Sequence, residues 1–195
     1  MSKLLQLLCP DVYVDSLPAV DLVDLQRRQI EALLLDLDNT LVPWRSHDIS
    51  PAVAQWVSQA CQGMKVCIVS NSRTPKRLEK LAGQLGISFV KRGAKPRRVG
   101  FRDALKLLGV EPSKAAVIGD QVFTDILGGN RLGARTILVR PIHRREFIGT
   151  KVTRLAERLV LRMLERRGMI ADRALIPKYQ GEQLGQNDGQ KRLEQ

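Results

Sequence analysis

The sequence predicts an α/β fold, a doubly wound, Rossmann-like three-layer sandwich on a mainly parallel sheet of five strands. Five short apolar runs lie along the chain, and segments with a helical apolar period separate them. Each run shows little alternation of apolar and polar residues, which is typical of strands buried on both faces of a parallel sheet. Strands that alternate with helices at this spacing imply right-handed crossovers and helices on both faces of the sheet.

The predicted strands are the apolar runs themselves. Each run has four residues, a length that favours a strand over a helix. They cover residues 32–35, 66–69, 87–90, 115–118 and 136–139.

Start and stop signals delimit the predicted helices. A Ser-Pro pair and a Thr-Pro pair each offer an N-cap followed by proline at the first helical position. Glycines follow two of the apolar stripes, where a helix commonly ends. These signals are Ser50, Thr74, Gly86 and Gly109, and a shorter helix is expected over 124–132.

A length of 195 residues suits one domain, which we place at 1–170. It includes an N-terminal extension over 1–30 and a basic C-terminal helix over 150–167. The segment 177–195, from Pro177 onward, is rich in Gln, Gly and Glu without apolar periodicity, so we expect a disordered tail.

The chain is strongly basic, with 32 Lys and Arg against 20 Asp and Glu and a net charge of +12. This excess indicates an anionic partner: a phosphate substrate, lipid headgroups or nucleic acid. The 44% hydrophobic and 27% charged residues exclude a wholly disordered or collagen-like chain. Three cysteines without metal-ligand spacing, no signal-peptide core and no long apolar stretch favour a cytoplasmic protein.

Small polar or charged residues follow each of the first four predicted strands. In an open parallel sheet, ligands bind beyond the carboxyl ends of the strands, so these residues converge on one edge. This convergence is the strongest functional indication in the sequence. The residues are Asp36, Asp38, Thr40, Ser70, Asn71, Lys95, Asp120 and Asp125.

Two of the carboxylates suit covalent phosphoryl transfer. Asp36 and Asp38 are two residues apart, so on an extended chain both can point the same way. One carboxylate can attack phosphorus while the other handles protons for the leaving oxygen and then for water.

The other charged residues suit a metal ion and a phosphoryl group. Asp36, Asp120 and Asp125 would repel one another if they met, and Mg²⁺ would relieve that repulsion. Lys95 would add a compact positive charge for the phosphoryl group, and the Ser70 hydroxyl could donate hydrogen bonds to it.

Each residue also has a plain structural interpretation. A single Asp after a strand is more often a helix cap or a turn residue, and Ser70-Asn71 could be turn chemistry. Lys95 lies in a run of basic residues that could be a solvated face. The joint pattern carries the hypothesis, because the set is far less expected by chance than any one member.

In order and spacing, these residues resemble the four motifs of the haloacid dehalogenase superfamily of phosphatases. Further segments resemble its YqeG-type subfamily, which is similar to mitochondrial phosphatidylglycerophosphate phosphatases. The likeness covers roughly the first 165 residues. It rests on Asp36-Leu37-Asp38-Asn39-Thr40-Leu41, Ser70-Asn71, Ala94-Lys95-Pro96, Gly119-Asp120-Gln121-Val122-Phe123-Thr124-Asp125, Leu8-Cys9-Pro10-Asp11-Val12-Tyr13 and Thr150-Lys151.

The resemblance implies a role for each motif residue. Asp36 would be the nucleophile and Asp38 the general acid and base. Thr40, Ser70, Asn71 and Lys95 would contact the phosphoryl group. Mg²⁺ would be held by Asp36, the Asp38 carbonyl and Asp120, with Asp125 in support.

The spacing of the motifs leaves no room for the cap domain that many members of the superfamily carry. The segment 40–66 has room for a loop and one helix, and 70–95 for one helix and one strand. We therefore expect an open site, which suits a large substrate or one presented at a surface.

The predicted basic helix over 150–167, with arginines from Arg154 to Arg166, has three interpretations. Its apolar residues Val152, Leu155, Leu159 and Met163 share one face, and Arg recurs every fourth residue on another. The apolar face could dock on the domain and leave a solvated basic side. The helix could instead lie on an anionic membrane, or bind nucleic acid.

Two classes of function stay open from sequence. The first is a Mg²⁺-dependent phosphatase, acting on phosphatidylglycerophosphate at a membrane or, alternatively, on nucleotides, sugar phosphates or nucleic-acid ends. The second is a basic module that binds RNA or a ribonucleoprotein on a phosphatase scaffold without turnover. The five intact residues Asp36, Asp38, Lys95, Asp120 and Asp125 favour the first class.

Overall fold

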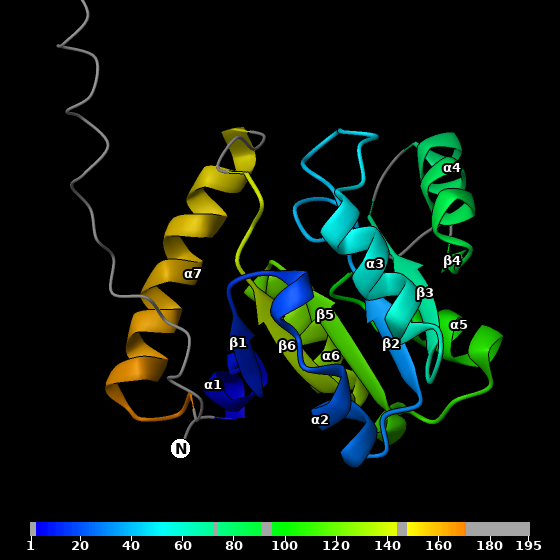
Figure 1. Ribbon diagram of the computed structural model, residues 1–195. Coiled ribbons are helices and arrows are strands. Elements are labelled where there is room, and N and C mark those ends of the chain that lie inside the picture. Colours follow the sequence, from blue (N-terminus) through cyan, green and yellow to red (C-terminus); the bar gives the residue numbers. More distant parts are fainter. Residues whose placement is uncertain (1–2, 72–73, 91–94, 144–147, 171–195) are drawn as a thin grey trace, which may run out of the picture.

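The computed structural model describes residues 3–71, 74–90, 95–143 and 148–170 (Figure 1). Its centre is a sheet of six parallel strands in the order β1-β6-β5-β2-β3-β4. The predicted tail from Pro177 lies outside the described residues. The strands are β1 (Val12–Val14), β2 (Ala32–Leu35), β3 (Lys65–Val69), β4 (Ser88–Val90), β5 (Ala115–Gly119) and β6 (Arg135–Val139).

The predicted α/β fold is confirmed, but the prediction of five strands was wrong by one. The additional strand, β1, lies in the stretch expected to be an N-terminal extension and pairs with β6. It has only three residues, followed at once by a 3₁₀ turn, η1 (Leu17–Ala19). A run this short gives no detectable apolar period.

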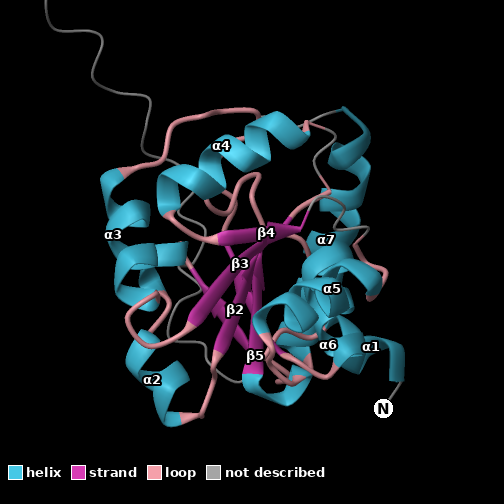
Figure 2. Cartoon of the chain, turned by 90° about the vertical axis from the view of Figure 1, so that its right-hand side faces the viewer, coloured by secondary structure: helices cyan, strands magenta, loops and turns pink. Residues whose placement is uncertain are grey.

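Helices cover both faces of the sheet (Figure 2). The face with α2, α3 and α4 buries Leu33, Leu35, Val66 and Ile68. The other face packs Leu34 against α5. The helices are α1 (Lys3–Leu8), α2 (Leu22–Arg27), α3 (Pro51–Ala60), α4 (Pro75–Leu85), α5 (Val99–Leu108), α6 (Leu127–Leu132) and α7 (Ile148–Arg166), and a 3₁₀ turn, η2 (Pro112–Lys114), precedes β5.

Ser50, Gly86 and Gly109 act as the sequence predicts, whereas Thr74 lies at the N-cap position of α4 but its side chain forms no capping hydrogen bond. The Ser50 hydroxyl caps α3 by accepting a hydrogen bond from the backbone N–H of Val53, at 3.3 Å. Gly86 and Gly109 end α4 and α5 with left-handed φ angles of 66° and 64°, a conformation that costs glycine little. The helix expected over 124–132 has two parts, a π-helical turn η3 (Val122–Ile126) and then α6.

Helix α7 docks on the domain through a different face from the apolar one identified in the sequence. Leu164 is fully buried, and Val160 and Leu161 pack with it against α1 and η3. In contrast, Leu155 and Leu159 are 55% and 57% exposed. Apolar periodicity does not identify the docking face, because two charged residues, Arg154 and Glu157, lie on it. Arg154 binds the Asp120 carbonyl oxygen there, and Glu157 binds the Phe123 N–H.

No domain is inserted after β2 or between β3 and Lys95 in the part of the chain that the structure describes, as the motif spacing predicted. Among the described helices, none combines the length and apolar character needed to cross a bilayer.

Candidate active site

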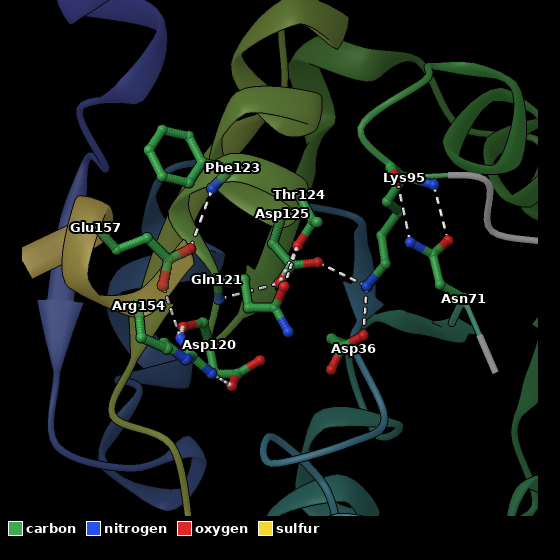
Figure 3. Close-up of polar contacts among 10 residues, drawn as sticks. All are labelled: Asp36, Asn71, Lys95, Asp120, Gln121, Phe123, Thr124, Asp125, Arg154 and Glu157. Carbon is green, nitrogen blue, oxygen red and sulfur yellow. Dashed lines mark hydrogen bonds and ion pairs between the residues drawn. The ribbon is translucent and has the colours of Figure 1, made fainter. Parts of the chain in front are cut away.

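The predicted site residues lie where the strand order reverses. The chain runs from β2 outward to β3 and β4, then returns to place β5 on the other side of β2. In such sheets the crevice beyond the carboxyl ends of these central strands is the usual ligand site. Asp36 follows β2 and Asp120 follows β5, and Figure 3 shows their carboxylates facing a common space.

A tight turn after β2 fixes the first two carboxylates. The Asp36 N–H continues the sheet by donating to the Ile118 carbonyl oxygen at 2.9 Å. Asn39 then adopts a left-handed φ of 65°, and its N–H donates to the Val42 carbonyl oxygen at 2.7 Å. The buried Leu37 side chain anchors this turn, so Asp36 and Asp38 are held on a rigid segment.

Lys95 joins two of the carboxylates. Its buried Nζ donates to Asp36 Oδ1 and, at 2.6 Å, to Asp125 Oδ1 (Figure 3). The structure thus brings together residues that are 59 positions apart in the sequence. Charge-assisted bonds of this kind are among the strongest hydrogen bonds in proteins.

Asn71 holds the Lys95 backbone. Its Nδ2 donates to the Lys95 carbonyl oxygen at 3.0 Å, and the Lys95 N–H donates to Asn71 Oδ1 at 2.8 Å. Both polar atoms of the Asn71 amide thus bind the Lys95 backbone, and contact between Asn71 and a substrate phosphate stays a prediction. Ser70 is buried at the end of β3. Thr40 is also buried, and its hydroxyl has no hydrogen-bond partner among the described residues.

Asp125 depends on the missing side chain of Gly119. A Cβ at position 119 would lie 2.3 Å from Asp125 Cγ, which is far inside van der Waals contact. The second Asp125 oxygen, Oδ2, accepts bonds from the Gln121 N–H at 3.2 Å and the Thr124 hydroxyl at 3.3 Å. Gly119, the last residue of β5, therefore leaves the space in which the Asp125 carboxylate sits.

Arg154 and Glu157, on α7, belong to the site and were not predicted to. Arg154 donates to the Asp120 carboxylate and, at 2.5 Å, to the Asp120 carbonyl oxygen. Glu157 accepts from Arg154 at 2.9 Å and from the Phe123 N–H at 3.3 Å. The basic row of the helix is therefore not all solvated, because its first arginine turns inward (Figure 3).

Asp38 has a separate partner. Arg77, a buried residue of α4, pairs with its carboxylate through Nη2 at 2.9 Å and Nη1 at 3.2 Å. The Arg45 N–H also donates to Asp38 Oδ1, at 3.1 Å. Sequence reasoning did not identify Arg77, whose only signal is its place in the helix that follows Ser70-Asn71.

The buried charges of the site do not balance. Among the residues that the structure describes, Asp36, Asp120 and Asp125 pair with two cations, Lys95 and Arg154. Burial, with Asp125 and Asp38 nearby, raises the pKa of Asp36 to about 7 despite the opposing effect of Lys95. Burial also raises the pKa of Asp120, and Asp36 adds to this.

The pKa of Lys95 is raised, so its side chain stays charged. Burial alone would lower it, but Asp125 and Asp36 together outweigh burial and raise it. The ammonium group therefore stays protonated while the carboxylates around it compete for an additional positive charge.

The acidic cluster has the composition of a divalent-cation site. Asp36, Asp120 and Asp125 each offer one oxygen, and these three atoms lie within 4.8 Å of one another. Asp120 Oδ1 is buried, and no described residue forms a hydrogen bond with it. A buried carboxylate oxygen without a partner is costly, so this atom fits a metal ligand, and Mg²⁺ prefers such oxygens.

The raised pKa of Asp36 predicts how stability depends on pH in metal-free protein. Between pH 4 and pH 7 the native carboxyl keeps a proton that the unfolded chain releases, so its contribution to stability falls as pH rises. Urea unfolding in EDTA should show wild type losing stability across this window relative to Asp36→Asn. A difference that is flat, or that rises with pH, would contradict the assignment.

Comparisons with known proteins agree with this geometry. Residues 93–146 match the family described as HAD-hydrolase-like. The chain is 36% identical over 162 residues to a Bacillus subtilis (strain 168) protein named probable phosphatase YqeG, covering 83% of this chain and 94% of that one.

Two further proteins are similar. Over 182 residues the chain is 29% identical to phosphatidylglycerophosphate phosphatase 1, chloroplastic/mitochondrial, of Arabidopsis thaliana, covering 88% of this chain but only 52% of that protein. The structure of HAD-hydrolase YfnB from Bacillus subtilis, bound to magnesium, has the same fold, with a TM-score of 0.50 at 13% identity over 62% of this chain and 91% of that one. The chain thus belongs to the YqeG-type phosphatases of the haloacid dehalogenase superfamily and is a phosphoric monoester hydrolase.

Proposed function

We propose that this chain hydrolyses a phosphate monoester with Mg²⁺, through an aspartyl-phosphate on Asp36. The observation that carries the proposal is the buried cluster of Asp36, Asp120 and Asp125. In it Asp36 and Asp125 share Lys95, and one Asp120 oxygen has no hydrogen-bond partner among the described residues. A binding module would have no use for carboxylates held in such mutual repulsion.

In the proposed reaction, an Asp36 oxygen attacks phosphorus and the bond from phosphorus to the leaving oxygen breaks. Asp38 gives its proton to that oxygen and then takes one from the water that attacks the aspartyl-phosphate. The Asp36–phosphorus bond breaks, phosphate leaves and the Asp36 carboxylate is regenerated. Throughout the reaction Lys95 neutralises charge on the phosphoryl oxygens, and the hydroxyls of Ser70 and Thr40 donate hydrogen bonds to them.

Asp36, Asp120 and the Asp38 carbonyl would hold the metal, with Asp125 in support. The ion supplies positive charge to the phosphoryl group during transfer. Arg154 already binds the Oδ2 atom of Asp120, so its guanidinium would share that carboxylate with the metal.

The proposed substrate is phosphatidylglycerophosphate. Three observations support it: the similarity to a phosphatidylglycerophosphate phosphatase, the net charge of +12, and the lack of an inserted cap among the described residues. A site without a cap can accept a headgroup that is still attached to a membrane. Turnover of nucleotides, sugar phosphates or nucleic-acid ends is the alternative.

We also propose that α7 contacts an anionic membrane from the cytoplasmic side. Leu155, Leu159 and Met163 are four residues apart and form one exposed row, with Met163 36% exposed. The exposed side chains of Arg158, Arg162 and Arg166 lie beside this row. Apolar residues flanked by arginines are typical of helices that lie in the interface of an anionic bilayer.

The substrate prediction is tested by phosphate release from a panel of esters. The panel is phosphatidylglycerophosphate in mixed micelles, an aryl phosphate, nucleotides and phosphorylated oligonucleotides, each with Mg²⁺ or with EDTA. We expect the lipid to be preferred, and Asp36→Asn and EDTA each to reduce release to background.

Asp103→Asn is the matched control, because Asp103 is an exposed carboxylate on α5 that is not a member of the cluster. Preference for another ester would overturn the lipid substrate but keep the chemistry. Folded, Mg²⁺-loaded protein that turned over none of the panel would contradict the proposed function and favour RNA binding.

The membrane prediction is tested by vesicle flotation. Wild type should float with anionic vesicles and much less with neutral ones, and high salt should weaken the effect. Replacing Leu155, Leu159 and Met163 by Gln should reduce flotation without affecting hydrolysis of a soluble aryl ester, since exposed substitutions rarely disturb folding.

Val99→Gln with Leu107→Gln is the control pair, because both residues are large, apolar and exposed on α5. Equal losses from both sets of substitutions would mean that general apolar exposure, and not the α7 row, causes the binding. No preference for anionic vesicles would refute the contact altogether.

A further inference from the structure

Arg77 occupies a position that the proposed reaction does not yet explain. A buried arginine is costly unless its donors are satisfied, and every nitrogen of this guanidinium has an acceptor. Its Nη atoms bind the Asp38 carboxylate, and its Nε and Nη2 donate to the Ser46 carbonyl oxygen at 2.9 and 2.7 Å.

These contacts of Arg77 connect α4 to the segment that follows the turn after β2. Ser46 lies eight residues beyond Asp38, and the neighbouring Arg45 N–H binds the same carboxylate. Both Asp38 oxygens are therefore occupied, Oδ1 by Arg45 and Arg77 and Oδ2 by Arg77. The Asp38 side chain is nonetheless 26% exposed, so it needs these bonds to keep one orientation.

We propose that Arg77 is a positioning residue, which holds Asp38 in the orientation needed to transfer a proton to the leaving oxygen. The inference rests on the proposed function, since it concerns the proton step of the same reaction. Arginine suits this place, because its planar fork holds several donors in fixed directions toward a carboxylate and a backbone carbonyl, whereas lysine offers a single point charge.

Loss of proton transfer by Asp38 should affect two kinds of phosphate ester differently. An alkyl phosphate releases an alkoxide, which needs a proton as it leaves, but a nitrophenyl phosphate releases a stable anion that needs none. In a reaction with a covalent intermediate, kcat/KM reports only the steps up to release of the first product. A substitution that disturbs proton transfer by Asp38 should therefore lower kcat/KM for the alkyl ester and leave kcat/KM for the aryl ester unchanged.

The test compares kcat/KM for an alkyl phosphate and for p-nitrophenyl phosphate in wild type, Arg77→Met, Arg77→Lys and Asp38→Asn. For Arg77→Met we expect a fall of about a hundredfold with the alkyl ester, the lower end of general-acid effects, and little change with the aryl ester. Arg77→Lys should not restore the alkyl rate. The ratio of the two values in one variant is independent of how much of the protein is folded.

Two further measurements complete the test. In the Asp38→Asn background, Arg77→Met should cause no additional loss, because the residue acts through the missing carboxyl. Lys80→Met, an exposed substitution on the same helix, is the matched control and should leave both values unchanged.

Equal losses with both esters would show a merely structural role, and additive losses in the double variant would show that Arg77 acts without Asp38; either result overturns the inference. If Arg77→Lys restored kcat/KM for the alkyl ester, the positive charge of Arg77 and not its geometry would explain the effect, and the positioning role would be overturned. Wild type that hydrolyses neither ester would refute the proposed function itself, and the inference with it.

Discussion

The molecule is organised around the burial of three carboxylates beside two cations. Removing a charged group from water costs several kcal/mol even in real proteins, so such groups are stable only when other charges or bonds compensate. Lys95 binds Asp36 and Asp125, and Arg154 binds Asp120. Among the described residues these cations leave one negative charge of the three uncompensated, and this charge suits the site to a divalent cation and a phosphoryl group.

The fold serves this arrangement at several points. The reversal of strand order between β2 and β5 brings Asp36 and Asp120 together. Gly119 leaves space for Asp125, and Asn71 fixes the backbone of Lys95. Helix α7 completes the set, because Arg154 reaches inward while Leu155, the next residue, is exposed. A helix is only about 10 Å wide, so the proposed membrane contact and the catalytic cluster lie close together.

The sequence predicted the parts of the structure that depend on local pattern. Apolar runs located β2 to β6, and spacing identified the residues that meet at their ends. It could not predict that Arg154 and Arg77 join the site, because neither residue follows a strand; both reach the carboxylates from helices, and how a helix docks depends on tertiary packing. The docking face of α7 was missed for the same reason: Glu157 looks solvent-facing until its partner, the Phe123 N–H, is known.

The most direct test of the account is to trap the intermediate. Wild type should be mixed with Mg²⁺ and substrate, quenched in acid and reduced with borohydride, which converts an aspartyl-phosphate to homoserine. Peptide mass spectrometry should then find homoserine at position 36 and at no other aspartate, and none when substrate is omitted. Homoserine at position 38, 120 or 125, or rapid turnover without any reduced aspartate, would contradict the central claim that Asp36 forms the covalent bond.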